Sequence, residues 1–138
     1  MITNIEDLTS IADKFSSKGL LFDAGCDTNN IDKYIAICIS INPEKNICTV
    51  KDWQWWDLDV DEEAAEIYAE TGSHPCLIKS DCVIEDQAGR YKYKEWVRSS
   101  LLSNFSHNCI FETSNTFYIL VGKGSRKKVS LDVVRSIF

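Results

Sequence analysis

The chain has few of the residues and patterns that mark metal-binding, fibrous and membrane-spanning proteins. Its 138 residues include 2 prolines, 6 glycines and 2 histidines, and no two of its 6 cysteines have CxxC spacing. So little proline and glycine excludes a fibrous or low-complexity chain, and the cysteines and histidines form no recognisable pair of zinc ligands. No apolar run reaches the roughly 18 residues that suggest a membrane span. We therefore expect neither a metal site nor a membrane partner.

Sequence motifs of catalysis are also missing, since the chain has no GxSxG, P-loop, HExxH or GxGxxG pattern. Two histidines do lie near cysteines, as His74 with Cys76 and His107 with Cys109. Both cysteines lead into apolar sequence, whereas a nucleophilic thiolate needs an accessible, electropositive setting. The sequence favours a protein with no catalytic residues and no cofactor, in which the cysteines are buried structural thiols.

The start of the chain, MITNIEDLTSIADKF, has no basic region, apolar stretch and cleavage site in the order of a secretory signal. This predicts a cytoplasmic protein with reduced cysteines. A length of 138 residues favours one domain, over residues 1–138, with a core large enough to need no disulfide.

Charge is distributed unevenly around the net value of −6. Residues 57–86 carry ten acids and only one base, Lys79, whereas residues 87–138 carry nine bases and three acids. These segments can neutralise each other across the fold, or they can form separate faces for partners of opposite charge. The overall acidity argues against non-specific DNA binding.

Hydrophobic spacing predicts helices in the N-terminal part, residues 1–45. One helix is expected over residues 4–17, and a second follows Asn30, ending before Pro43. The apolar stripe of the second helix comprises Ile31, Tyr34, Ile35, Cys38 and Ile39. A third, acidic helix is expected over residues 61–71, capped by Asp59 or Asp61, with Ala64 and Ile67 facing inward.

The rest of the chain, residues 46–138, is expected to be mainly β. Strands are predicted over residues 47–58 and 76–86, with Trp96 on a later strand, and residues 109–122 form either a hairpin or one long strand. Ser130 is expected to cap a short terminal helix. The predicted fold class is α+β, with N-terminal helices and a C-terminal antiparallel sheet or partly open barrel.

Three tryptophans lie within four residues, at Trp53, Trp55 and Trp56. Strand alternation places Trp53 and Trp55 on one face, and Trp56 on the other. Either the sheet is covered on both sides, or one face exposes an aromatic surface for a base, a ligand or a protein. Together with Asp57, these tryptophans are our candidate partner-binding residues.

The glycine-rich basic segment 122–128, GKGSRKK, is the candidate ligand site. Its glycines allow backbone N–H groups to converge, and the predicted terminal helix adds a positive dipole end, as in phosphate sites. An ordinary β-to-α loop is the alternative. The candidate ligand-binding residues are Lys123, Ser125, Arg126, Lys127 and Lys128.

The acidic run favours a helix N-terminus over a metal site. Its carboxylates oppose the helix dipole favourably, whereas a calcium loop needs a central glycine that this run lacks. An acidic docking face is the further alternative. The run comprises Asp57, Asp59, Asp61, Glu62 and Glu63.

The C-terminal two thirds of the chain, residues 48–138, resembles an uncharacterised bacterial and prophage-associated family, a domain of unknown function. The resemblance rests on Trp55-Trp56-Asp57, on Phe111-Glu112-Thr113 followed by Asn115-Thr116 and Tyr118, and on the glycine–basic segment 122–128. It implies a cytosolic accessory or prophage protein and assigns no catalytic residue.

Our leading hypothesis from the sequence is a non-enzymatic protein-binding module of the inhibitor, immunity or counter-defence type. It rests on the missing motifs, the segregated charge and the abundant tryptophans. The alternative is a module that binds a phosphate-bearing small molecule or nucleotide at residues 122–128. A homodimer is compatible with either, because exposed sheet edges can pair.

Overall fold

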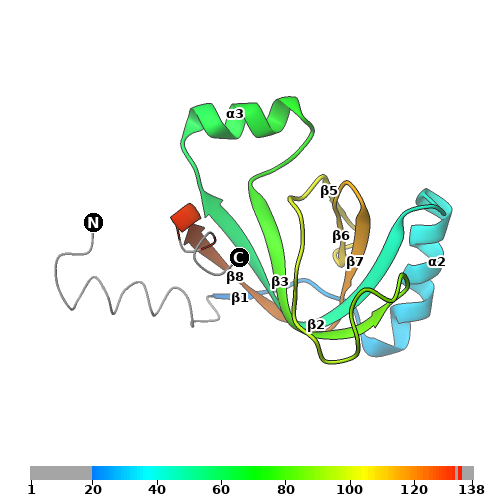
Figure 1. Cartoon of the computed structure of the whole chain (residues 1–138). Helices are drawn as coiled ribbons and strands as arrows, with labels where there is room; N and C mark the ends of the chain where they lie inside the picture. The colour runs from blue at the N-terminus through cyan, green and yellow to red at the C-terminus, as the bar shows by residue number, and fades with distance from the viewer. Residues whose placement is uncertain (1–19, 133, 135–138) are drawn as a thin grey trace.

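The computed structural model describes residues 20–132 and 134, which form two α-helices and eight β-strands (Figure 1). The chain has the α+β class predicted from its sequence. The elements in order are β1 (Leu20–Phe22), the 3-10 turn η1 (Thr28–Asn30), α2 (Ile31–Ile41), β2 (Asn46–Asp59), α3 (Glu62–Glu70), β3 (Cys76–Asp86), β4 (Val97–Arg98), β5 (Asn104–Ser106), β6 (Ile110–Glu112), β7 (Thr116–Leu120) and β8 (Gly124–Ser130).

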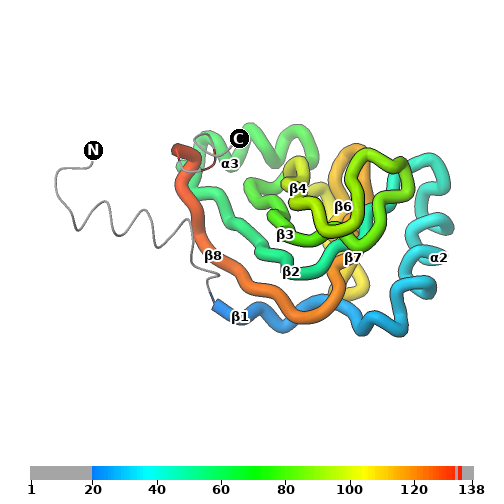
Figure 2. Tube along the Cα trace, turned by 60° about the horizontal axis from the view of Figure 1, so that its bottom comes forward, coloured from blue at the N-terminus to red at the C-terminus, as the bar shows by residue number. Residues whose placement is uncertain are grey.

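The long strand β2 organises the sheet, which curls into a half-barrel (Figure 2). One edge of β2 pairs with β3, and the other pairs first with β7 and then with β8. The pairings of β2 with β7 and β8 are parallel, so the sheet is mixed and the prediction of an antiparallel sheet was wrong on this point. The chain after β2 travels through α3 and β3 to β6 before it returns beside the start of β2, and β7 and β8 then run in the same direction as β2.

An irregularity in β2 places Trp53 and Trp55 on the same face as Cys48 and Val50. Asp52 has a positive φ of 50°, and the alternation of side chains shifts by one residue around it. Cys48 and Val50 before it, and Trp53 and Trp55 after it, therefore all join one buried cluster. A regular strand would place the residues before and after Asp52 on opposite faces.

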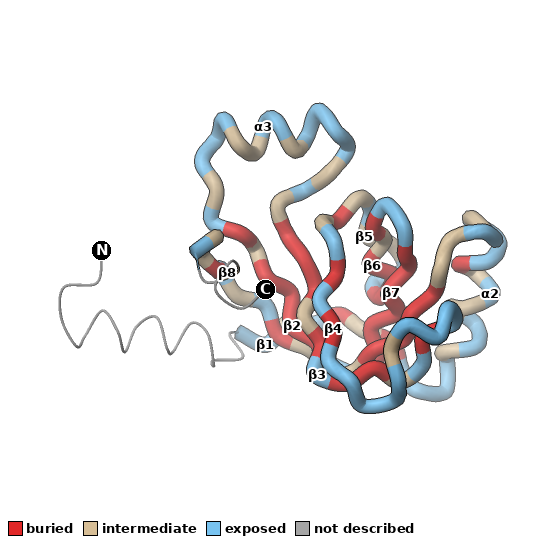
Figure 3. The backbone as a smooth tube through the Cα atoms, viewed as in Figure 1, coloured by how far each residue is buried: buried red, intermediate tan, exposed pale blue. Residues whose placement is uncertain are grey.

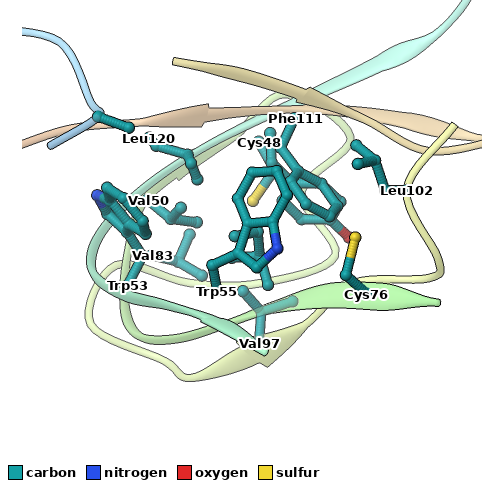
Figure 4. Close-up of a cluster of buried hydrophobic side chains, with 13 residues drawn as sticks. Cys48, Val50, Trp53, Trp55, Cys76, Val83, Val97, Leu102, Phe111 and Leu120 are labelled. Atoms are coloured by element: carbon teal, nitrogen blue, oxygen red, sulfur yellow. The ribbon is translucent and has the colours of Figure 1, made fainter. Parts of the chain in front are cut away.

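The main core fills the inside of the half-barrel. Figure 4 shows Trp55 in the middle of this cluster, surrounded by side chains from β2, β3, β6 and β7. Buried residues concentrate along the central strands in Figure 3, and α3 stands apart from them. Trp56 belongs to a separate cluster with Leu58, Leu77 and Val129, so the sheet is covered on both faces.

Helix α2 covers the outer face of the sheet next to β7, as Figure 1 shows. It begins after Asn30 and ends before Pro43, as predicted. Cys38, on its apolar face, packs in one cluster with Phe117 of β7. Ile39 is an exception, since it is exposed instead of joining the predicted stripe. None of the helices among residues 20–132 is long and apolar enough to cross a membrane.

Helix α3 lies between the ends of β2 and β3 and projects from the body of the molecule (Figure 1). The Asp61 carboxylate caps it by accepting a hydrogen bond of 2.8 Å from the Ala64 N–H, which matches one of the two predicted caps. The helix has no buried residue, and Ile67 is 56% exposed. The prediction that Ile67 faces inward was therefore wrong.

The hairpin alternative is confirmed, because β6 and β7 are antiparallel and the Thr113 N–H bonds to the Thr116 carbonyl. Trp96 precedes β4 instead of lying on a strand. The expected helix over residues 4–17 lies outside the described residues. No terminal helix is defined among the described residues, and most of its predicted residues also lie outside them.

Candidate functional site

Strands β2 and β8 bring the two predicted sites together. The parallel register pairs Trp55 with Arg126 and Asp57 with Lys128. Alternation then sorts the predicted residues between the two faces of the sheet. Arg126 lies over Trp55 on the inner side, whereas Lys127 lies 5.2 Å from the ring of Trp56 on the outer side.

At the open end of the half-barrel, Trp55, Asp57 and Arg126 form one hydrogen-bonded group. The Arg126 Nε donates to Asp57 Oδ2 at 2.6 Å and its Nη2 donates to Oδ1 at 2.9 Å. The Trp55 indole N–H donates to the same Oδ1 at 3.2 Å. The Arg126 guanidinium also lies 4.9 Å from the Trp55 ring and 5.2 Å from the Phe22 ring. Aromatic rings and a carboxylate therefore hold this guanidinium in a defined orientation.

The Asp57 carboxylate also raises the pKa of Arg126, through its hydrogen bonds and its charge, against the opposing effect of partial burial. The side chains of Arg126 and Asp57 remain 44% and 36% exposed. A pair this accessible to water adds little to stability, because solvent screens it. Its accessibility leaves it free to meet a ligand.

A cavity of about 410 Å³ opens beside this group, at the mouth of the half-barrel. Its walls come from the end of β2, the segment that leads into β3, and the segment around β5. It is lined by Trp55, Asp57, Leu58, His74, Pro75, Cys76, Leu102, Asn104, Phe105 and Arg126. A concave, mostly apolar site with a few polar groups is typical of ligand pockets, and β-barrel mouths are a common place for them.

The segment 122–128 is mostly a strand, so its prediction as a loop before a helix was wrong. Residues from Ser125 onward pair with β2, and Gly124–Arg126 pair with β1. Backbone groups that pair with neighbouring strands cannot converge on a phosphate. Gly122 has a positive φ of 70° at the turn before β8.

The five candidate ligand-binding residues face three different depressions. Lys123 and Ser125 line one of about 300 Å³, Arg126 lines the mouth cavity, and Arg126, Lys127 and Lys128 line a third with Leu20 and Leu21. Ser125 is buried. The arrangement does not gather the five around one anion, and their binding of a phosphate-bearing ligand stays a prediction.

The tryptophans of β2 are core residues. Trp53, Trp55 and Trp56 are 1%, 5% and 1% exposed. Each indole N–H has an acceptor, namely the Gly122 carbonyl for Trp53, Asp57 for Trp55 and the Gln54 amide oxygen for Trp56. This burial supports the core alternative for the side chains. Partner binding by this segment stays a prediction, and only Asp57 of the four is accessible.

All six cysteines are buried and free. Burial raises the pKa of four thiols to about 12, against 9.0 ordinarily, and these are Cys38, Cys48, Cys76 and Cys109. Neither cysteine of the two Cys–His neighbours is therefore ionised near neutral pH, which disfavours a nucleophilic role.

These thiols predict a loss of stability in alkali. The folded state holds their protons more tightly than the unfolded chain, so their contribution is complete below pH 9 and declines as the pH rises toward 12. Urea unfolding in reducing buffer should therefore show a midpoint that falls between pH 8 and pH 10.5. Cys48→Ala should show a weaker fall than wild type, and an equal fall would contradict the assignment to the thiols.

The acidic run lies partly on β2 and partly at the start of α3. Asp61 caps the helix, and Glu62 and Glu63 occupy its first turn, where carboxylates oppose the helix dipole favourably. Among the described residues, no group of three or more His, Cys, Asp or Glu side chains is placed to hold a metal ion. The observed arrangement is that of a helix N-terminus.

Of the residues that line the mouth cavity, sequence reasoning assigned only Trp55, Asp57 and Arg126 to a binding site, and it missed His74, Asn104 and Phe105 among others. Asn104 and Phe105 lie on the short strand β5, and His74 lies just before β3; backbone hydrogen bonds of Leu102 to His74 and to Cys76 join the two segments. No local pattern marks that contact. The aromatic character of Phe105, near the similar Phe111, was the one available signal.

A search of the curated proteins and a search of the solved structures found no match to the chain. A family model does match, over residues 23–136. The match begins before α2, so it covers more of the chain than the resemblance over residues 48–138. It includes all of α2, α3 and the residues of the mouth cavity. The chain therefore belongs to the family described as the domain of unknown function DUF6957.

Proposed function

We propose that the protein is a non-enzymatic binding module that occupies a basic surface of another protein through helix α3. The observation that carries the proposal is the row of glutamates on a helix that projects from the body. In keeping with the resemblance described above, we also propose that it is a cytosolic bacterial accessory or prophage protein, of the inhibitor, immunity or counter-defence type.

The glutamates of α3 share one side of the helix. Glu62, Glu66 and Glu70 are spaced four residues apart and are all exposed, so they lie in one row along the helix. Glu63 extends the row at its first turn. Within residues 20–132, no lysine or arginine forms an ion pair with any of them.

This row works against the helix in the free protein. Like charges four residues apart destabilise a helix by a few tenths of a kcal/mol per pair, or about 0.2–0.5 kcal/mol. A nine-residue helix is already marginal, and α3 buries no residue that would compensate. A basic partner would convert this repulsion into attraction, so the arrangement favours binding over stability.

Ile67 supplies an apolar contact beside the row. It is exposed on the same helix, whereas Ala64 and Tyr68 are half-buried on the side nearer the body. Interfaces commonly combine an apolar centre with a charged rim. The outward side of α3 has both, on one short helix.

The test compares two triple variants with the same net charge. Glu62→Gln/Glu66→Gln/Glu70→Gln removes the row, and the control Glu44→Gln/Glu85→Gln/Glu95→Gln removes three exposed carboxylates elsewhere. Each immobilised protein is exposed to lysate of the host at low and high salt, and retained polypeptides are identified by mass spectrometry. Three exposed ion pairs predict about tenfold weaker retention of a basic polypeptide by the first variant only.

The dependence of retention on salt concentration is a second, independent measurement. Retention by wild type should fall steeply with salt, because exposed charge pairs are screened. Equal retention by the two variants, or retention of only acidic polypeptides, would contradict the proposal. Circular dichroism of both variants checks that the fold is intact.

A further inference from the structure

We propose that the mouth of the half-barrel is a binding site for an organic carboxylate with an apolar body, with Arg126 as its anchor. The site does not include α3, so this proposal is independent of the proposed function and can be tested separately. The shared chemistry of the ligand is a carboxylate next to an aromatic or aliphatic group. Both a small carboxylic acid and the C-terminus of a polypeptide have it.

The cavity has the size and shape for such a ligand. Its volume of about 410 Å³ falls within the range of roughly 300–1,000 Å³ that is usual for small-molecule sites. Leu102, Pro75 and Phe105 contribute apolar walls, and the Trp55 ring contributes the inner end. Cys76 and Leu102 both line the cavity, and Figure 4 shows them on the same side of Trp55.

The aromatic inner end is rigid. Trp55 makes edge contacts with Phe105 and Phe111, each with ring centroids 5.0 Å apart, and with Phe22 at 5.4 Å. Its indole N–H is fixed by Asp57. Pre-organised rings of this kind lower the entropy lost when an apolar group binds.

The polar side of the cavity presents hydrogen-bond donors that a ligand with acceptor atoms could bind. Asp57 already accepts three hydrogen bonds, one from Trp55 and two from Arg126. Arg126 keeps Nη1, which makes no hydrogen bond to the described residues, and the exposed side chains of His74 and Asn104 also form none among them. A ligand carboxylate would supply acceptors to these donors.

The charge balance favours a monoanion over a phosphate group. Asp57 neutralises Arg126, and its carboxylate would repel a doubly charged ligand about twice as strongly as a singly charged one. The free edge of the guanidinium can still form two parallel hydrogen bonds with a planar carboxylate. The cavity therefore selects for one negative charge with an apolar tail.

The experiment measures binding of four probes to the whole protein by NMR, following the tryptophan indole N–H signals. Two probes carry the carboxylate, 3-phenylpropanoate as the small acid and N-acetyl-alanyl-phenylalanine as the polypeptide C-terminus. The other two are their neutral amides. The Trp55 signal should shift with at least one acid and with neither amide. Which acid binds more tightly identifies the source.

Variants locate the site. Arg126→Gln should weaken binding of the acid by about tenfold or more, because a charge-assisted hydrogen bond is lost. Lys92→Gln removes one exposed base that does not line the cavity and should leave the affinity within about twofold, because solvent screens its charge. His74→Ala/Asn104→Ala changes only exposed lining residues and decides the question if Arg126→Gln fails to fold; it should also weaken binding.

Three results would overturn the site: equal shifts with acid and amide, unchanged affinity in the folded lining variants, or no Trp55 shift at millimolar probe. The variant Glu62→Gln/Glu66→Gln/Glu70→Gln should bind the acids like wild type. Failure of the carboxylate site therefore leaves the proposed role of α3 untouched, and failure of that role leaves this site untouched.

Discussion

Arg90→Leu should lower the free energy of unfolding by about 2–3 kcal/mol, less than the roughly 3–5 kcal/mol for a fully buried ion pair, because the Arg90 side chain is 37% exposed and solvent screens part of its charge. Arg90 pairs with Asp86, whose side chain is fully buried. The Arg90 Nε donates to Asp86 Oδ2 at 3.1 Å, and the Asn46 amide donates to Oδ1 at 2.8 Å. Without the guanidinium, the carboxylate would be left buried with its charge uncompensated.

The pH dependence gives this prediction a second readout. Burial by itself would raise the pKa of Asp86, but hydrogen bonds from Arg90 and Asn46 outweigh it and bring the pKa below the usual 3.8. The carboxylate therefore contributes stability above pH 3.8, and the contribution is lost as the pH falls below that value. In Arg90→Leu the pKa should rise, and acid unfolding should begin at a higher pH.

Two variants act as controls for Arg90→Leu. Lys92→Leu removes an exposed base two residues away and should change stability by less than about 0.5 kcal/mol. Asp86→Asn/Arg90→Leu removes the buried charge as well and should recover part of the loss. Urea unfolding of all three at pH 7 measures the differences. If Arg90→Leu and Lys92→Leu unfold at the same midpoint, the pair does not stabilise the fold.

Gly124→Ala is expected to destabilise the protein by about 1–3 kcal/mol, as overpacking of a core does. A Cβ at this position would come within 2.3 Å of the Trp53 ring, closer than a side chain can approach. Trp53 cannot easily retreat, because it is 1% exposed and its indole N–H donates to the Gly122 carbonyl at 3.0 Å. The strand must therefore move away from β2, or the ring must leave its rotamer.

A double-variant cycle tests the cause. In a Trp53→Leu background the ring is gone, so adding Gly124→Ala should change stability by less than about 0.5 kcal/mol. The free energies of unfolding of wild type, both single variants and the double variant are measured in urea. Equal effects of Gly124→Ala in the two backgrounds would mean that Trp53 is not what requires glycine there.

Local sequence patterns predicted the elements that depend on local interactions. The stripe that begins at Ile31 predicted α2, and the run from Cys76 to Asp86 predicted β3 to the residue. The segment 122–128 failed because glycine and four charged or polar residues in a row are typical of a loop. Pairing with β2 and β1, more than 60 residues away, outweighs that preference.

In the candidate site, too, the local features were predictable from the sequence and the long-range pairing was not. Trp55, Asp57 and Arg126 were each singled out from local features, but as two separate sites with different ligands. Only the parallel register of β2 and β8 joins them, and a single sequence holds no sign of it. Ile67 was misplaced for a related reason, because its spacing fits a core face that α3 does not have.

The pairing of β2 along both of its edges has a consequence for synthesis on the ribosome. Its second edge pairs with residues 116–120 and 125–130, which follow their partners by about 70 residues. At roughly 5–20 residues per second, this edge waits about 4–14 s for its partners to be made. During that interval an apolar strand with three tryptophans has an open edge, which is a site for pairing with other chains. The nascent protein should therefore depend on a chaperone that shields strands, and fragments that stop before residue 116 should aggregate.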